Sequence, residues 1–232
     1  MAEPYLICPD DWIRGTLEPN RAVGLIESVD SGSTPSTGRD DFWDGGIPWL
    51  TPKEVARRED GMYVSITERT LSEIGLASCS AKLHPPGTVM LTKRAPVGAV
   101  AVNVVPMATN QGFLNFHCGP LIRPLYFAFW LKVNRPYLEL VANGSTYPEL
   151  YLSDLFEFEL AVPSLGEQDK VLEFISALQF VALLTEPLQQ SITVPAAVVS
   201  VQQQNQRLRD IRNTILPMLF SGEMTLSKEQ SL

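Results

Sequence analysis

The sequence predicts a globular part that contains both strands and helices, followed by a helical tail. Strand-like runs separated by turn residues occupy residues 87–113, and a further alternating run occupies residues 156–162. From residue 164 onward, apolar side chains recur at helical spacing. With 232 residues, of which 45% are hydrophobic, the chain can bury a sizeable core, so general disorder is not expected.

The first distinctive segment is SGSTPSTGRDDFWDGGIPWLTPKEV, residues 31–55. It holds two tryptophans, three prolines and four glycines without helical or strand periodicity. These residue types favour an ordered loop that is held by packed aromatic rings.

The middle of the chain predicts a pair of strands and then a third. The runs TVMLTK and AVAVNVV are separated by the turn residues RAPVG, which indicates two strands joined tightly, with Lys93 and Arg94 at a strand end. The uncharged segment MATNQGFLNF follows and predicts another strand, with Asn110 and Gln111 at its edge.

Two short helices are expected next, over residues 124–133 and 136–142. Each opens with a proline, which a first helical turn tolerates because the missing N–H would be unpaired there. Asn143 and Gly144 are typical of a helix end.

A capping box marks the start of the helical tail at about Gly166. Ser164 and Glu167 have the spacing at which each side chain satisfies an N–H of the first turn. Pro187 and Pro195 interrupt the tail, so two helical pieces are expected rather than one rod.

The second helical piece carries an apolar stripe with alternating spacings of three and four, which is typical of a coiled-coil seam. Its one polar member, Gln204, could set the register at a cost in stability. The alternative is an amphipathic helix that packs on its own domain. The stripe consists of Val194, Ala197, Val201, Gln204, Leu208, Ile211, Ile215 and Met218.

The charge distribution is uneven. The formal net charge is -8, which argues against nucleic-acid binding, yet residues 74–138 contain no Asp or Glu. Phosphates respond to local charge, so the bases of this window could form a positive face on an acidic protein. The alternative is an apolar core segment with scattered surface bases. Those bases are Lys82, Lys93, Arg94, Arg123, Lys132 and Arg135.

Several classes of protein lack support in the sequence. The three cysteines are far apart, and two histidines do not supply the ligands that a zinc site needs, although the pair His117–Cys118 hints at one. Phosphate-binding loops and the usual hydrolase motifs are not found, so a small hydrolase stays an unsupported alternative. We expect no catalytic residues, no metal and no cofactor in this chain. Without a targeting or membrane-spanning segment, a cytoplasmic location is expected.

Six segments in order resemble one family. They are the loop GSTPSTGRDDFWDGGIPWLTPKEV, then TVMLTKRAPVGAVAV, MATNQGF, VANGST, FELAVPSLGEQDKV and LRDIRNTILPMLFSGEM. Together they resemble the specificity subunit of type I restriction-modification enzymes, and they extend over nearly the whole chain. Each segment alone is weakly specific, whereas six in series are strongly specific.

The resemblance implies an α+β fold: a mixed target recognition domain followed by a helical conserved region with a coiled coil. On this basis we expect a DNA-binding target recognition domain at residues 1–165. A helical region for pairing and methyltransferase docking is expected at residues 166–224, and a flexible tail at residues 225–232. The usual family member has two recognition domains and two helical regions, whereas this sequence has one of each.

A half-size subunit needs a second copy or a sister half-subunit. We therefore expect a homodimer or heterodimer that pairs its helices and presents two recognition domains to a bipartite site in double-stranded DNA. The expected partners are a DNA methyltransferase (modification) subunit and, where present, a restriction subunit. In this family S-adenosylmethionine and ATP belong to those partners, so the chain itself is expected to be non-catalytic. A coiled-coil adaptor without DNA recognition is the alternative.

Candidate DNA-binding residues follow from side-chain chemistry within the resembling segments or just after them. Trp43 and Trp49 are interpreted as scaffold, because fixed rings hold neighbouring loop residues in one geometry. Bases could be read by residues whose donors and acceptors match base edges in the major groove, although the amides could equally satisfy backbone groups. The base-reading candidates are Lys93, Arg94, Asn110, Gln111, Ser145 and Tyr147. The phosphate-binding candidates are Lys53, Arg57 and Arg58. The alternative for these three is that they are solvated surface charges.

Overall fold

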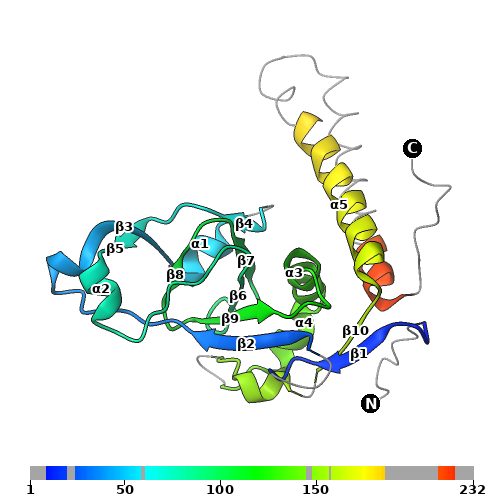
Figure 1. The fold of residues 1–232 in the computed structure, drawn as a ribbon, viewed down its shortest axis with the longest axis horizontal. Coiled ribbons are helices and arrows are strands. Elements are labelled where there is room, and N and C mark those ends of the chain that lie inside the picture. The colour runs from blue at the N-terminus through cyan, green and yellow to red at the C-terminus, as the bar shows by residue number, and fades with distance from the viewer. Residues whose placement is uncertain are drawn as a thin grey trace. The chain divides into compact units, whose positions relative to one another are not determined.

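The computed structural model describes residues 9–19, 24–58, 61–144, 148–156, 158–185 and 214–222 (Figure 1). The chain divides into two compact units: Arg14–Leu160 forms one, and Met1–Ile13 with Ala161–Leu232 forms the other. The first thirteen residues therefore group with the helical tail, a grouping that the predicted boundaries do not contain. The functional domains proposed from the sequence stay a prediction.

The Arg14–Leu160 unit is built around a five-stranded sheet in the order β2-β9-β6-β7-β4. Its neighbours are antiparallel except for the parallel pair β4 and β7. The predicted pair of tightly joined strands is confirmed, since β6 and β7 are antiparallel neighbours. The strands are β2 (Ile26–Ser31), β4 (Tyr63–Val64), β6 (Val89–Thr92), β7 (Val100–Asn103) and β9 (Phe113–Cys118).

A smaller three-stranded sheet has the order β5-β3-β8. It pairs β3 (Trp43–Leu50) with β5 (Arg69–Leu71) antiparallel and with β8 (Ala108–Thr109) parallel. The helix α2 (Glu73–Ala77) contacts β3 and β5. A cluster of buried apolar residues from both sheets, including Leu50, Met90 and Phe113, forms the core between them.

The two predicted proline-led helices are present as α3 (Pro124–Val133) and α4 (Arg135–Val141), the second shifted by one residue. Helix α3 contacts β6 and β7, and Phe127 packs edge-on against Phe116 of β9 with ring centroids 5.3 Å apart. Because α3 covers one face of the five-stranded sheet and the apolar cluster covers the other, β6 and β7 are buried along their whole length.

Of the two readings of residues 74–138, a positive face or an apolar core segment, this arrangement favours the core segment. The window supplies β6, β7, β9 and α3, which are the core of the unit, and a carboxylate is costly to bury there. Its bases also pair with acids: Lys82 with Asp30 from outside the window, and Arg135 with Glu139 in the next turn of α4. The missing acids therefore indicate burial, and not a cationic surface.

The expectation of a loop over residues 31–55 is also corrected in part. The segment contains a short 3-10 helix η1 (Asp40–Phe42), the strand β3 and the helix α1 (Pro52–Ala56). The register of β3 shifts between Trp43 and Ile47, where Asp44 and Gly46 take positive φ angles of 60° and 87°. This bulge removes the alternation by which a strand is recognised in a sequence.

The second unit contains α5 (Leu165–Thr185), and its capping box is as predicted. The backbone N–H of Ser164 donates to Glu167 at 3.1 Å, and that of Glu167 donates to the Ser164 hydroxyl at 3.4 Å. Residues 214–221 form a further helix, in which Leu216, Leu219 and Phe220 are buried. Among the described helices, none is long and apolar enough to span a bilayer.

The remaining elements are short. A two-stranded sheet pairs β1 (Ile13–Thr16) with β10 (Glu159–Val162), and a 3-10 helix η2 (Leu152–Leu155) precedes β10. The strand predicted at residues 156–162 is therefore present in its second half.

Candidate nucleic-acid interface

The loop that leads into β3 is held by two indole rings. Trp43 and Trp49 are each 6% exposed and pack edge-on with ring centroids 5.1 Å apart. The indole N–H of Trp43 donates to the carbonyl of Ser36 at 3.2 Å, and that of Trp49 donates to the carbonyl of Ser33 at 3.0 Å. Buried rings with satisfied N–H groups agree with the interpretation of both tryptophans as scaffold.

The turn between β8 and β9 lies against this loop. The backbone N–H of Ser33 donates to the carbonyl of Thr109 at 3.0 Å, and the hydroxyl of Thr34 donates to Gln111 Oε1 at 2.5 Å. The side-chain oxygen of Asn110 accepts the N–H of Gly112 at 2.9 Å, so this amide holds its own turn. Gln111 is exposed, which leaves its amide nitrogen available to a ligand.

Lys93, at the end of its strand, contacts the same turn through its backbone. The N–H of Lys93 donates to the carbonyl of Gly112 at 2.8 Å. A Cβ on Gly112 would lie only 2.7 Å from Pro52 Cγ, so the start of α1 is packed against the same glycine. Three segments that are distant in the sequence, at Pro52, Lys93 and Gly112, therefore meet around Gly112. We call this surface the Gly112 junction.

Glu149 pairs with both predicted base-reading cations. Its carboxylate lies 3.3 Å from Lys93 Nζ and 3.0 Å from Arg94 Nη2, and its backbone bridges to both Arg94 and Asn143. Partial burial raises the pKa of Glu149, but the hydrogen bonds from Arg94 and Lys93 outweigh it, so the pKa lies below its usual range. The carboxylate is ionised at neutral pH and holds the two cations in place.

The three phosphate-binding candidates lie on or just after α1 and are exposed. Arg57 is paired with Glu68, and Arg58 donates to the carbonyl of Tyr63. The Lys53 side chain makes no hydrogen bond or ion pair within the described part of the chain and is the most available of the three. Phosphate binding by the three residues stays a prediction.

Other candidates lie outside the described residues. These are Ser145 and Tyr147 among the base-reading candidates, and Val201, Gln204, Leu208 and Ile211 of the predicted seam. Two seam residues, Ile215 and Met218, fall in the described helix, where both are half-buried. Pairing through the seam stays a prediction.

Two contacts were missed by sequence reasoning. Glu149 lies outside the acid-free window, so nothing in the sequence connected it with Lys93 and Arg94. The guanidinium of Arg69 lies 3.4 Å from the ring centroid of Trp43, a cation–π contact between neighbouring strands β5 and β3. Strand pairing was needed to find it.

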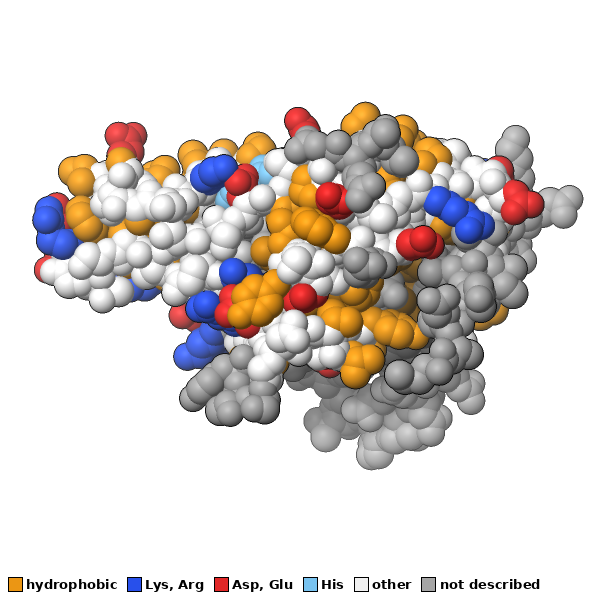
Figure 2. All heavy atoms as spheres, turned by 90° about the horizontal axis from the view of Figure 1, so that it is seen from below, with side chains coloured by type: hydrophobic (Ala, Val, Ile, Leu, Met, Phe, Trp, Pro, Cys, Tyr) orange, Lys and Arg blue, Asp and Glu red, His pale blue; other side chains and the backbone are white. Residues whose placement is uncertain are grey.

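The surface charges are dispersed. On the face shown in Figure 2, Lys and Arg side chains form small separate groups, most of them with an acidic side chain close by. A broad cationic surface is therefore not a feature of this face. On this face the structure offers separate local contacts to a ligand, and not a large positive field.

Comparison with known proteins identifies the family. The family model described as "Type I restriction modification DNA specificity domain" matches residues 20–194, about three quarters of the chain. The chain belongs to this family. The resemblance inferred from the six segments is thereby confirmed, and the adaptor and hydrolase alternatives are not favoured.

Individual relatives of this specificity family agree. The chain is 43% identical over 170 residues to the type I restriction enzyme MjaIX specificity subunit of Methanocaldococcus jannaschii, covering 72% of this chain and 38% of that protein. It is 25% identical over 200 residues to the EcoR124I/EcoR124II specificity subunit of Escherichia coli, covering 82% of this chain and 47% of that protein. This chain therefore spans less than half the length of these relatives.

Solved structures support the fold. The crystal structure of the HsdS subunit from Thermoanaerobacter tengcongensis matches with a TM-score of 0.57 at 16% identity, covering 96% of this chain and 48% of that chain. The mixed sheets and helices seen here are therefore the fold of a specificity subunit.

Proposed function

We propose that this chain supplies the DNA sequence specificity of a type I restriction-modification enzyme and is itself non-catalytic. Membership of the specificity family carries the proposal. The Gly112 junction supports it, because three of the six segments by which the sequence resembles the family meet there around one glycine.

Base recognition is assigned to the Gly112 junction. Arg94 is half exposed at 50% and Gln111 is exposed, and their side chains match the edges of guanine and adenine in the major groove. Lys93 is only 17% exposed, so it supports Glu149 and Arg94 more than it reaches a base. Lys53 at the start of α1 is placed to add a phosphate contact, which positions the protein without specifying bases.

The proposed assembly contains two recognition domains. Either two copies of this chain or this chain and a sister half-subunit pair through the seam and present both domains to a bipartite site in double-stranded DNA. A homodimer would read the same half-sequence twice in inverted orientation. The methyltransferase partner would supply S-adenosylmethionine, and a restriction subunit would supply the ATP-driven motor.

A methylation assay tests the specificity. The purified chain is mixed with a type I methyltransferase subunit and a DNA library, and methylated adenines are mapped. We expect methylation at one bipartite sequence, and Arg94→Gln should relax the preference at one position of each half-site. Arg14→Gln, which removes an exposed cation of β1, is the matched control and should leave the sequence unchanged. Absence of a complex and of methylation would overturn the proposal.

A mass measurement tests the pairing. Leu208→Asp or Ile211→Asp should reduce the free protein and its complex to one copy of the chain, because an unpaired buried charge costs several kcal/mol. The circular dichroism spectrum should still show a folded recognition unit. A variant that remains dimeric would show that the seam assignment is wrong.

A further inference from the structure

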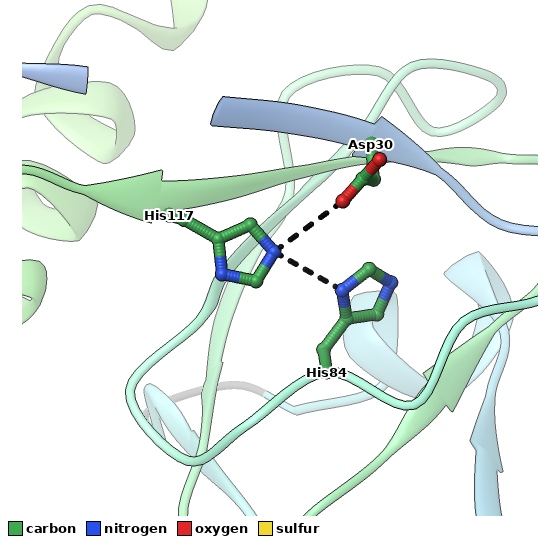
Figure 3. A group of neighbouring side chains, drawn as sticks. All are labelled: Asp30, His84 and His117. Atoms are coloured by element: carbon green, nitrogen blue, oxygen red, sulfur yellow. Dashed lines mark hydrogen bonds and ion pairs between the residues drawn. The ribbon is translucent and has the colours of Figure 1, made fainter. Parts of the chain in front are cut away.

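Three potential metal ligands converge beside the five-stranded sheet. They are Asp30 on β2, His84 in the loop before β6, and His117 on β9 (Figure 3). Each residue offers one ligand atom, and these three atoms all lie within 4.8 Å of one another. We call this group the Asp30–His84–His117 cluster.

The strand register places two of the three side chains. In the antiparallel pair β2 and β9, Ser28 lies opposite His117 and Asp30 lies opposite Asn115. Asp30 and His117 are therefore diagonal neighbours on one face of the sheet, where side chains reach each other. Cys118 is the next residue on β9 and points to the opposite face, so it does not belong to the cluster.

The third side chain is placed by a rigid turn. The backbone of His84 exchanges two hydrogen bonds with Met107, at 2.9 and 3.0 Å. The buried amide of Asn103 donates to the carbonyls of His84, Pro85 and Val105, at distances between 2.9 and 3.2 Å. The position of the His84 ring is thus determined by backbone contacts that do not depend on the cluster.

The distances between ligand atoms fit a small metal ion. His84 Nδ1 lies 3.3 Å from His117 Nε2, which in turn lies 3.6 Å from Asp30 Oδ2. A tetrahedral zinc ion with bonds of about 2.0–2.1 Å needs ligand atoms about 3.3 Å apart. The remaining pair, within 4.8 Å, requires a shift of at most about 1.5 Å, which a rotation of the Asp30 side chain supplies.

Hydrogen bonding alone satisfies the cluster poorly. The same nitrogen of His117 is the nearest partner of both the Asp30 carboxylate and the His84 ring. When both rings are neutral, either His117 Nε2–H donates to one neighbour or His84 Nδ1–H donates to His117 Nε2, so this nitrogen satisfies only one of its two neighbours at a time. One cation at the centre would accept electron pairs from all three atoms at once.

The cluster is accessible but sheltered. His84 is 1% exposed, while the side chains of Asp30 and His117 are 22% and 20% exposed. Lys82 pairs with Asp30 Oδ1 and leaves Oδ2 directed at His117. Lys82 thus orients the Asp30 carboxylate, as the hydrogen-bonding partners of metal ligands commonly do. The positive charge of Lys82, however, opposes the binding of a cation.

We propose that Asp30, His84 and His117 bind one divalent transition-metal ion of the zinc class, with a fourth position open to water. Two imidazoles and one carboxylate form a ligand set that suits this class of metal. The ion would join β2, the loop before β6 and β9, which are far apart in the sequence. Its role is to stabilise this unit, and the proposal does not depend on the proposed function.

The test uses the full chain purified without a histidine tag, since the chain contains only two histidines and both lie in the cluster. After EDTA treatment, Zn²⁺ is added and the imidazole nitrogens are observed by NMR. We expect one Zn²⁺ per chain, shifts at Nδ1 of His84 and Nε2 of His117, and a higher melting temperature. Co²⁺ should give the visible absorption bands of a low-symmetry, four-coordinate site.

Variants separate ligation from folding. His117→Gln and Asp30→Asn should bind Zn²⁺ at least about tenfold more weakly, because loss of even an outer partner weakens metal affinity about 10–100-fold. Asp41→Asn is the matched control: Asp41 is an exposed carboxylate of the same unit that is paired with Arg39 at 2.7 Å, and its loss should change nothing. Unshifted imidazole nitrogens in the wild type, or equal Zn²⁺ affinity in the folded Asp30→Asn variant, would overturn the proposal.

Discussion

Gly32 opens the GSTP sequence of the loop before β3, and we predict that Gly32→Ala strongly destabilises the Arg14–Leu160 unit. A Cβ at this position would lie 2.2 Å from the backbone oxygens of Asn110 and Thr109, and 2.3 Å from the Thr109 hydroxyl. Carbon and oxygen normally approach no closer than about 3.3 Å. The loop therefore has to move by about 1 Å away from β8.

That movement breaks contacts whose energies can be estimated. The hydrogen bond from the Ser33 N–H to the Thr109 carbonyl is lost, and the carbonyl of Ser33 is pulled from the indole of Trp49. Leaving such groups unsatisfied costs about 1–3 kcal/mol, and overpacking costs about 1–3 kcal/mol. Alanine restricts the unfolded chain and returns about 0.4–1 kcal/mol. We expect a net loss of about 1–5 kcal/mol.

Urea unfolding followed by tryptophan fluorescence measures this loss. The matched control is Gly38→Ala in the same loop, where the nearest atom to the new Cβ is 4.0 Å away. That variant should be neutral or slightly stabilising, since only the effect on the unfolded chain remains. If Gly32→Ala unfolds within about 0.5 kcal/mol of Gly38→Ala, the close approach is not what requires glycine here.

Three further predictions concern the polar contacts. Glu149→Gln should tighten binding to duplex DNA and steepen its salt dependence by about one unit of slope, because Lys93 and Arg94 lose their carboxylate. Fluorescence anisotropy at several salt concentrations measures the slope, and an unchanged slope would contradict the prediction. Burial, followed by the charge of the neighbouring histidine, lowers the pKa of His84 to about 4. As the pH falls, the unfolded chain therefore binds a proton at this histidine before the folded protein does. The free energy of unfolding of metal-free protein should fall by up to about 3 kcal/mol as the pH drops from 6.5 to 4. Urea titrations at several pH values measure this fall, which His84→Gln should lack. Trp49→Phe should cost about 1–2 kcal/mol in the same assay, because a loop carbonyl loses its donor, and a near-zero change would show that water replaces the indole.

Local signals in the sequence determined α3, α4 and the start of the helical tail. A proline in the first turn predicted α3 and α4 to within one residue, because the ring cannot sit deeper in a helix. The Ser164 and Glu167 pair predicted the first turn of α5, since both hydrogen bonds form within four residues. The ordered family segments determined the specificity family for the same reason: they can be recognised without knowing which residues meet.

Only the tertiary structure decided which residues meet. The bulged strand β3 was taken for a loop, because its partners β5 and β8, and not its own pattern, make it a strand. The acid-free window was taken for a possible cationic face, whereas it supplies α3 and the central strands beside the apolar cluster, and burial there explains the missing carboxylates. Glu149 reaches Lys93 and Arg94 across more than fifty residues of sequence.

The Asp30–His84–His117 cluster shows the same division. The sequence supplied two histidines thirty-three positions apart and an aspartate among many, with none of the short spacings that mark a metal site. The register of β2 against β9, and the turn that Asn103 holds, bring the three side chains together. Strand pairing and buried hydrogen bonds act between segments that are distant in the sequence. The sequence therefore shows which metal-ligating residues are present, but not that they lie close together in the fold.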